Sequence, residues 1–142
     1  MLDRVNFDTV ELLRKAGLRP TKQRRTIAHH LFKGQHRHVD AATLHEEACC
    51  YGENIALATI YNILHDFERV QLIRRVAVSA ERTWYDTDTG DHRHYYIGEE
   101  DRIMDCPEGN LELGTLADPP SGYTIKSVDI VIHLEPTDKP QA

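Results

Sequence analysis

Apolar residues in the first half of the chain recur with the spacing of α-helices. In residues 8–17 they repeat every three to four positions, and Gly17 is suited to end a helix in the left-handed conformation. Residues 21–34 repeat the pattern, with Thr21 as a candidate N-cap. A third segment with the same spacing begins at Asp40. The pattern predicts three consecutive helices in this part of the chain.

Residues 57–70, LATIYNILHDFERV, show the most regular helical spacing in the sequence. Their apolar residues fall at positions i, i+3, i+4 and i+7: Ile60, Ile63, Leu64 and Phe67. The opposite face carries polar and aromatic side chains: Thr59, Tyr61, Asn62, His65 and Asp66. This pattern predicts a fourth helix that packs on one face and leaves the other available to a partner.

Two short strands are predicted after the fourth helix. Residues 72–79 and 82–87 are rich in β-branched and aromatic side chains, and a turn near residues 79–81 joins them. Three or four helices followed by a β-ribbon form the pattern of a winged helix-turn-helix domain. We expect this domain to span residues 1–82.

The second half of the chain has the spacing of strands. Residues 94–98 and 101–105 flank an acidic turn, and residues 123–134 alternate apolar and polar side chains. The segment between them is rich in proline and glycine, and we expect it to be loop with at most a short helix. We therefore predict an α+β fold, in which residues 83–142 form a small α/β dimerisation domain with a three-stranded antiparallel sheet. So thin a sheet needs a partner for its second face, which favours a homodimer.

Charge is distributed unevenly between these two parts. The chain of 142 residues has a net charge of −6, but residues 1–82 carry 13 basic and 10 acidic side chains, whereas residues 83–142 carry 4 and 13. A mildly basic module suits a polyanion, and an acidic module suits a cation. The apolar stretches are too short to span a bilayer and no secretion signal is visible, so we expect a cytoplasmic protein without a membrane partner. The three cysteines form no C-x-x-C pair, which excludes a four-cysteine zinc site.

The exposed face of the fourth helix suits a helix that reads the major groove of double-stranded DNA. Thr59, Tyr61 and Asn62 supply hydroxyl, aromatic and amide groups that reach base edges and thymine methyl groups. Residues at the first two helices and the ribbon are candidates for backbone contacts: Lys15, Arg19, Thr21, Lys22, Arg24, Arg25, Arg74, Arg75 and Arg82. The alternative is a solvated basic face. These basic residues coincide with the winged-helix pattern, however, and this coincidence favours a DNA-binding role.

A second group of candidate residues lies around the sequence DHRHYY, residues 91–96. A turn at residues 98–101 would place His94 directly opposite Asp105 on the neighbouring strand, with Cβ atoms roughly 5 Å apart. His92 lies two residues before His94 and can point to the same side. An imidazole and a carboxylate at this separation predict a cation site, and the alternative is a solvated histidine-rich turn.

Two residues outside this hairpin can complete the site. His38 precedes the third helix, and Asp86 follows the ribbon at the junction between the modules. A mixed set of nitrogen and oxygen ligands suits divalent zinc, iron or manganese. A cation held by both modules would fix their relative orientation, as a regulator requires. The pattern assigns no role to the histidines of the helical half: His29, His30, His45 and His65.

Four stretches resemble the ferric uptake regulator (Fur) family along nearly the whole chain: GLRPTKQRRTIAHHLF, HRHVDAATLHEEA, ALATIYNILHDFERVQLI and TWYDTDTGDHRHYYI. Finer features are similar to its iron response regulator (Irr) branch, among them Asn62 after Tyr61, the run DTDTGDHRH and the lack of zinc-binding cysteine pairs. The resemblance implies a homodimer whose winged helices bind operator DNA. It also implies repression or activation of iron and haem genes according to metal or haem status.

The resemblance assigns roles to individual positions. The interdomain metal site of the family matches these positions: His38, Asp86, His94, Asp105 and, adjacent to the site or within it, His92. The base-reading tyrosine of the family matches Tyr61, and its minor-groove lysine matches Lys15. Ala56 stands where relatives usually carry serine or glycine, so the fourth helix loses a side-chain cap.

Two further ligand sites follow from the resemblance. A second metal site of the family matches these positions: Asp91, Glu112 and Val128 or Asp129, with Arg93 in place of an expected aspartate. The Arg93 guanidinium opposes a cation there. The Irr branch is associated with haem, for which the candidates are His92, His94 and Cys106, with a haem donor protein as a candidate partner. Cys106 precedes a proline, as in many haem-regulatory motifs, and its alternative role is that of a small packing residue.

These patterns favour a metal- or haem-responsive transcriptional regulator rather than an enzyme. One alternative is a metal-dependent hydrolase that activates water with His92, His94 and Asp86. The sequence offers it no clear general base and no nucleophile-base pair. A metal-buffering module is a further alternative, and it would leave the polar face of the fourth helix unexplained.

Overall fold

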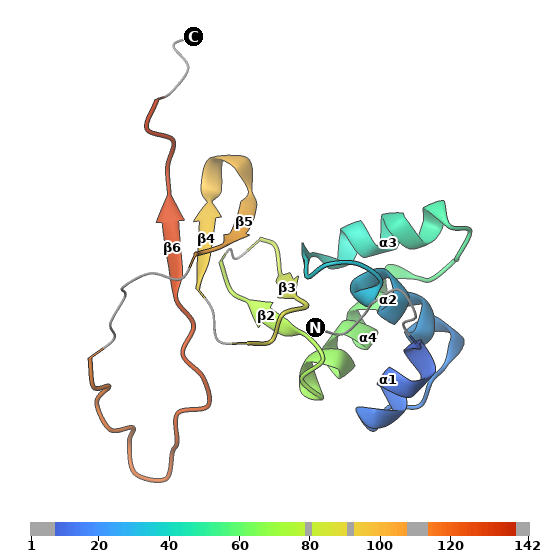
Figure 1. Ribbon diagram of the computed structural model, residues 1–142, viewed down its shortest axis with the longest axis horizontal. Helices are drawn as coiled ribbons and strands as arrows, with labels where there is room; N and C mark the ends of the chain where they lie inside the picture. Colours follow the sequence, from blue (N-terminus) through green and yellow to red (C-terminus); the bar gives the residue numbers. More distant parts are fainter. Residues whose placement is uncertain (1–7, 79–80, 91–92, 108–113, 139–142) are drawn as a thin grey trace. The chain divides into compact units, whose positions relative to one another are not determined.

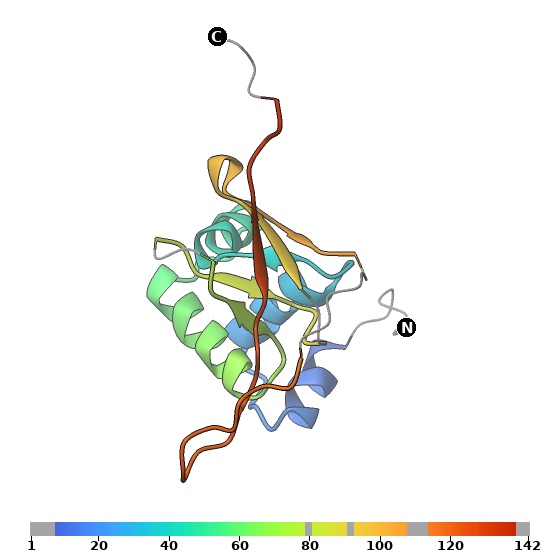
Figure 2. The same ribbon diagram turned by 90° about the vertical axis from the view of Figure 1, so that its left-hand side faces the viewer.

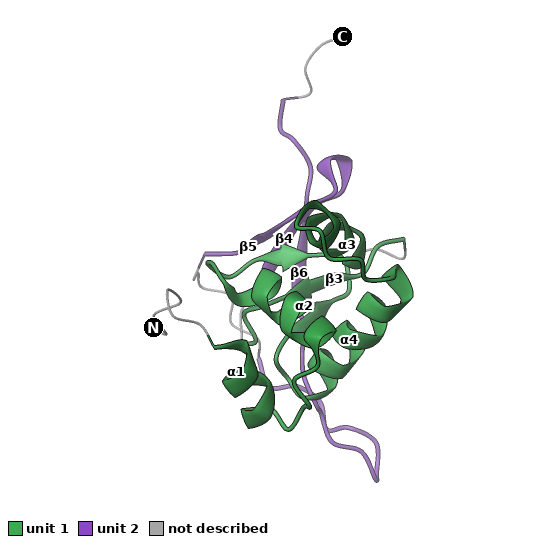
Figure 3. Cartoon of the chain, turned by 90° about the vertical axis from the view of Figure 1, so that its right-hand side faces the viewer, with its two compact units in different colours: residues 1–90 green, residues 91–142 purple. Residues whose placement is uncertain are grey.

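The computed structural model describes residues 8–78, 81–90, 93–107 and 114–138, and it divides the chain into two compact units. One unit comprises residues 1–90 and the other residues 91–142, coloured separately in Figure 3. Each unit is described by itself below. Among the described residues, no helix combines the length and the apolar character that crossing a membrane requires.

The first unit contains the four helices that apolar spacing predicts: α1 (Thr9–Lys15), α2 (Lys22–Phe32), α3 (Ala41–Cys50) and α4 (Leu57–Arg69). The predicted cap of α2 is confirmed, since Thr21 Oγ1 accepts from Arg24 N at 3.2 Å. The third helix begins next to Asp40 as expected, and Asp40 Oδ1 caps it by accepting from Thr43 N at 2.9 Å. Ala56, by contrast, gives α4 no side-chain cap. The start of α4 therefore has the backbone hydrogen bond from Ile60 N to Ala56 O at 3.1 Å but lacks the side-chain cap of α2 and α3.

One apolar core holds these helices together. The predicted inner face of α4, from Ile60 to Phe67, is buried, and it packs against Leu13 of α1 and Ile27 and Leu31 of α2. Helix α2 contacts each of the other three helices, and Figure 3 shows it among them. Burial of large side chains stabilises a domain by about 1.5–3 kcal/mol each, so this core fixes the face that α4 exposes.

The first unit also contains a three-stranded antiparallel sheet in the order β1-β3-β2. The predicted ribbon is confirmed as β2 (Arg74–Val76) and β3 (Trp84–Asp86). The two-residue strand β1 (His38–Val39) was not predicted, because two residues show no measurable periodicity. Since β3 pairs with both neighbours, residues 83–90 join the first unit, which runs eight residues beyond the boundary expected after Arg82.

The second unit is built on a sheet in the order β5-β4-β6. Strands β4 (His94–Ile97) and β5 (Arg102–Asp105) form an antiparallel hairpin around the 3₁₀ turn η2 (Gly98–Glu100). The α+β class and the three strands are as predicted, but the sheet is mixed rather than purely antiparallel, because β6 (Val131–Leu134) runs parallel to β4. A parallel neighbour needs a crossover of a dozen or more residues, which the long proline- and glycine-rich connection supplies.

The strand expected over residues 123–134 forms only in its last third. In Figures 1 and 2 residues 114–130 run away from the sheet as an extended excursion and return to it at β6. Tyr123, Ile125 and Val128 along this excursion are exposed, Tyr123 at 73%. These apolar side chains are therefore not covered by the described part of a single chain.

Candidate metal and DNA sites

A histidine and an aspartate are brought together in the first unit by strand pairing. His38 in β1 lies directly opposite Asp86 in β3, and the His38 Nε2 to Asp86 Oδ2 distance is 3.0 Å. Asp86 is only 1% exposed. A buried carboxylate is costly unless it is paired, and the imidazole supplies the pairing here.

The Asp86 carboxylate is also held at its other oxygen. Asp86 Oδ1 accepts a hydrogen bond from Asp88 N at 2.8 Å, so the plane of the carboxylate is fixed and Oδ2 faces the imidazole. One nitrogen donor and one carboxylate oxygen in this arrangement suit the borderline cations zinc, iron and manganese. The pair therefore offers two candidate metal ligands.

A second histidine and aspartate are paired in the second unit. The predicted hairpin register is confirmed, with His94 opposite Asp105, and the His94 Nε2 to Asp105 Oδ1 distance is 3.6 Å. His94 is buried, whereas the Asp105 side chain is 51% exposed. This separation leaves room for a cation to replace the direct contact between the two side chains. His92, the fifth candidate ligand, lies outside the described residues.

The other predicted ligand sites are described only in part. Asp91 and Glu112 of the second candidate metal site lie outside the described residues. Asp129 is exposed just before β6, and Arg93 is half-buried just before β4. The candidate haem ligand Cys106 follows β5 and is also half-buried, with its backbone N–H donating to Arg93 O at 2.8 Å. A hydrogen bond with the Cys106 thiol raises the pKa of Tyr95, so this thiol has a polar neighbour.

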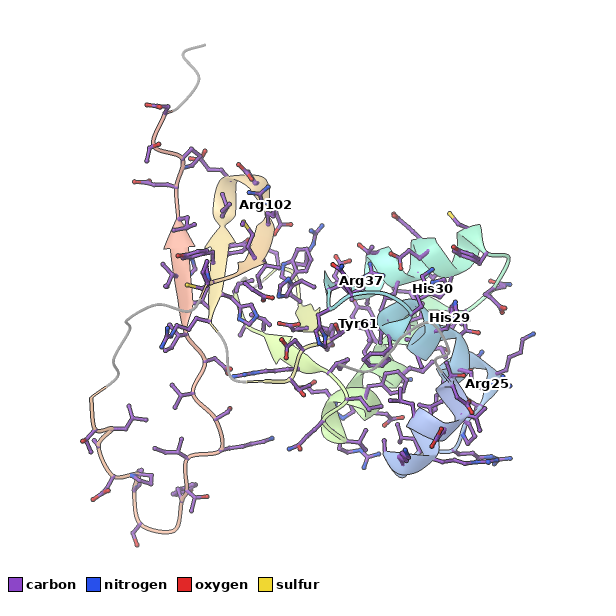
Figure 4. All side chains as sticks on the ribbon, viewed as in Figure 1. Arg25, His29, His30, Arg37, Tyr61 and Arg102 are labelled. Carbon is purple, nitrogen blue, oxygen red and sulfur yellow. The ribbon has the colours of Figure 1, made fainter. Side chains whose placement is uncertain are left out.

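The face of α4 predicted to read DNA is exposed. Tyr61, labelled in Figure 4, is 48% exposed, Asn62 is exposed and Thr59 is partly so. The opposite face is buried in the core, which holds these three side chains outward. A helix presented in this way after α3, with a β-ribbon behind it, has the form of a recognition helix.

The basic side chains differ in what they contact. Arg24 Nη2 lies 3.0 Å from Asp66 Oδ2, and Arg24 Nη1 donates to Arg19 O at 3.0 Å, so this guanidinium ties α2 to α4. Lys15 forms an exposed pair with Glu11 at 3.0 Å. The ribbon arginines also contact other groups of the first unit: Arg74 with Gly90 O, Arg75 with Glu68, and Arg82 with Asp40.

Three candidates remain open to a phosphate. Arg19, Lys22 and Arg25 have exposed side chains, and within the described residues none of the three takes part in an ion pair. Figure 4 labels Arg25 on α2. Thr21 caps α2, so its hydroxyl accepts from the backbone, as described above. These placements rank Arg19, Lys22 and Arg25 above Arg24 as phosphate contacts.

Two residues beside the His38–Asp86 pair were not singled out from the sequence. Arg37 and Thr87 are the neighbours in sequence of His38 and Asp86, and they bond to each other. Only the pairing of β1 with β3 reveals this, and a polar residue on either side of a ligand is too common a pattern to signal it. His30, to which the sequence assigned no role, is buried, and burial together with the charge of Lys33 lowers its pKa.

Comparison with known proteins defines the family. The family model described as the ferric uptake regulator family matches residues 15–132. The chain belongs to the ferric uptake regulator family. Members of this family are transcriptional regulators and not enzymes, so the hydrolase alternative is set aside.

Relatives with known roles match most of the chain. The peroxide-responsive repressor PerR of Staphylococcus epidermidis is 30% identical over 98 residues, which cover 69% of this chain and 65% of the relative. The ferric uptake regulation protein of Pseudomonas aeruginosa is 29% identical over 101 residues, covering 70% and 75%. The matched part therefore spans about two thirds to three quarters of these relatives.

Solved structures share the fold at lower sequence identity. The ferric uptake regulator of Pseudomonas aeruginosa with manganese has a TM-score of 0.70 at 21% identity, covering 93% of this chain and 100% of that chain. The ferric uptake regulator of Francisella tularensis with iron has a TM-score of 0.67 at 17% identity, covering 85% and 93%. A zinc-bound manganese uptake regulator has a TM-score of 0.64 at 21% identity, covering 91% and 99%. At these sequence identities the structural similarity establishes the fold of the chain and nothing further.

Proposed function

We propose that this protein is a metal-responsive transcriptional regulator, which binds operator DNA as a homodimer and senses a divalent cation held between its two units. The observation that carries the proposal is the buried Asp86 carboxylate, fixed at one oxygen by Asp88 N and facing His38 with the other. A protein gains little stability from such a buried pair, so a ligand role accounts for it better than a packing role.

The complete site would join the pair of the first unit to the pair of the second. His38 and His94 would supply neutral nitrogen donors, and Asp86 and Asp105 would supply two negative charges that balance a divalent cation. Four ligands of this kind suit zinc in a tetrahedral site, and iron or manganese when further ligands such as His92 or water are added. Solved relatives with manganese, iron and zinc support this range of metals.

Regulation would follow from the position of the ligands in the chain. Two belong to the unit that carries α4 and two to the other unit, so a cation bound by all four fixes the relative orientation of the units. In a dimer this orientation sets the spacing of the two α4 helices, and half-site spacing decides whether both can enter the major groove. If the protein binds the cation more tightly when its two α4 helices have the spacing that DNA requires, the cation raises the affinity of the protein for the operator.

The DNA contacts would come from α4 and α2. Tyr61 and Asn62 would contact bases, since Asn can bond adenine in two places and the Tyr61 ring can pack on thymine methyl groups. The exposed Arg19, Lys22 and Arg25 would contact phosphates.

Dimerisation would use the uncovered apolar residues of the second unit. Tyr123, Ile125 and Val128 are exposed on one extended segment, and Leu134 is exposed on β6. A second copy of the chain would bury these side chains and remove their apolar area from water. We place this regulator in the cytoplasm, where operator DNA and exchangeable metal are both available.

The Irr branch and haem are a second, finer candidate. The half-buried Cys106 thiol contacts Tyr95 near the end of β5, and Pro107 after it is exposed. If haem binds this thiolate, Cys106→Ala removes a thiolate-type Soret band and leaves the divalent metal content unchanged. An identical spectrum in the variant assigns Cys106 to packing. A second metal site is a separate candidate, and its proposed ligands are Asp91, Glu112 and Asp129. The positive charge of Arg93 disfavours a cation there.

One experiment tests the central proposal. Protein purified without chelator is analysed for metals, and its binding to operator and scrambled DNA is compared with and without the metal found. We expect retention of operator DNA that depends on metal and falls steeply with salt. Equal retention of both DNAs refutes specific regulation. Metal binding without any DNA retention supports the metal-buffering alternative.

A further inference from the structure

We propose that Thr87 and Arg37 are positioning residues for the cation, which hold the His38–Asp86 pair in a geometry suited to metal binding. The inference rests on the proposed function, because it concerns the same site. Neither residue need touch the cation. Both act through the ligands that neighbour them in the sequence.

Thr87 fastens the strand that carries His38. Thr87 is 5% exposed, and its Oγ1 accepts a hydrogen bond from Arg37 N at 2.9 Å. In the opposite direction Thr87 N donates to Arg37 O at 3.1 Å. His36 Nδ1 lies 3.3 Å from the same Thr87 hydroxyl. These contacts extend the β1–β3 pairing by one residue beyond His38 and Asp86.

The Arg37 side chain fastens the same point to two helices. Arg37 Nη1 lies 3.0 Å from Glu47 Oε2 and Nη2 lies 2.6 Å from Glu47 Oε1, so the guanidinium holds both oxygens of a carboxylate on α3. Arg37 Nη1 also donates to His30 O at 3.2 Å, near the end of α2. Arg37 and His30 are labelled in Figure 4. Paired two-point contacts of this kind fix direction as well as distance.

Such fastening is needed because β1 is short and lies at the edge of its sheet. Two residues of strand give few ladder hydrogen bonds, and an edge strand has a neighbour on one side only. A metal site tolerates displacements of only about 0.5 Å in its ligands. Without Thr87 and Arg37, the backbone that carries His38 would lose the contacts that extend this two-residue strand. Loss of such supporting contacts typically lowers metal affinity by about 10–100-fold.

The Thr87 hydroxyl can be tested with substitutions of nearly equal size. Thr87→Val removes the hydroxyl and keeps the shape of the side chain. Thr87→Ser keeps the hydroxyl and removes the methyl group. Titration calorimetry with Mn²⁺ on the full chain should show about tenfold weaker binding for Thr87→Val and nearly wild-type binding for Thr87→Ser. The matched control is Thr26→Val, which removes a threonine hydroxyl bonded to Lys22 O at 3.1 Å within α2.

A spectroscopic readout separates positioning from general stability. The visible absorption of bound Co²⁺ reports the geometry around the metal, so Thr87→Val should change the band shape while Thr26→Val should not. If Thr87→Val does not fold, Arg37→Lys tests the same arrangement, since lysine keeps the charge and loses the two-point contact with Glu47. We expect weaker Mn²⁺ binding and an altered Co²⁺ spectrum in that variant.

The outcomes distinguish the inference from the proposed function. Wild-type affinity and spectrum in Thr87→Val, or equal losses in Thr87→Val and Thr87→Ser, overturn the positioning role and leave the metal site standing. A wild-type chain that binds neither Mn²⁺ nor Co²⁺ overturns the proposed function itself.

Discussion

Loss of the His38 imidazole should weaken metal binding and also reveal how much of the site is already formed without metal. His38 Nε2 lies 3.0 Å from a carboxylate that is almost fully buried. His38→Ala therefore removes one of four proposed ligands and leaves Asp86 without its imidazole. A buried polar group that loses its partner costs about 1–3 kcal/mol, so the metal-free variant should itself be less stable. His38→Gln removes the imidazole ligand and retains a hydrogen-bond donor.

The stabilisation by metal gives a measurable magnitude. At a free metal concentration of about 100 Kd, binding stabilises the folded state by about 2.7 kcal/mol, since only the folded chain holds the site. A tenfold loss of affinity at the same concentration lowers this value to about 1.4 kcal/mol. The difference of about 1.3 kcal/mol corresponds to roughly 4 °C in the metal-induced rise of Tm for a chain of this size.

Thermal unfolding with and without Mn²⁺ measures this rise for each variant against its own metal-free form. His94→Ala should lose as much as His38→Ala, and His45→Ala on α3 is the matched control. Protons compete with metal for imidazole nitrogens, so titration calorimetry should show wild-type affinity falling below about pH 6. A wild-type rise of Tm in both His38→Ala and His94→Ala would refute the shared site.

Three further perturbations test the first unit. In gel-shift titrations Tyr61→Ala should weaken operator binding by roughly 1–3 kcal/mol and leave non-specific binding, whereas Lys15→Ala should weaken both and reduce the salt slope. Equal losses on operator and non-specific DNA in Tyr61→Ala, or a loss on operator DNA alone in Lys15→Ala, would contradict these roles. In urea unfolding Arg24→Met should cost about 1–2 kcal/mol because a part-buried pair is broken, whereas Arg25→Ala should cost little stability and weaken DNA binding; the reverse order would exclude a structural role for Arg24. Because burial lowers the pKa of His30 below its usual value near 6.5, stability should be complete above that pH and decline as the pH falls toward the lowered pKa, and urea unfolding of His30→Gln should show a flatter profile; an unchanged profile would assign the acid sensitivity to other groups.

The sequence by itself determined the elements whose stabilising interactions are local. Ile60 and Phe67 lie on one face of α4 because residues seven apart return to the same side of a helix. Asp40 caps α3 through a backbone group three residues away. The register of His94 with Asp105 followed from the turn between them, since the length of a short turn sets which residues face each other. Each of these interactions lies within one short stretch of the chain, with partners at most eleven residues apart, so the spacing in the sequence is sufficient to predict it.

Tertiary structure decided the features that join distant parts of the chain. His38 and Asp86 are 48 residues apart, and they meet because β1 pairs with β3. No periodicity in the sequence predicts this pairing. In the sequence Arg24 is not distinguishable from other basic surface residues, and only the packing of α4 against α2 places Asp66 beside it. The parallel direction of β6 likewise depended on the path of a long connection. Such contacts form when packing of the whole core fixes which segments lie side by side. The spacing of residues that are close in the sequence therefore does not predict them.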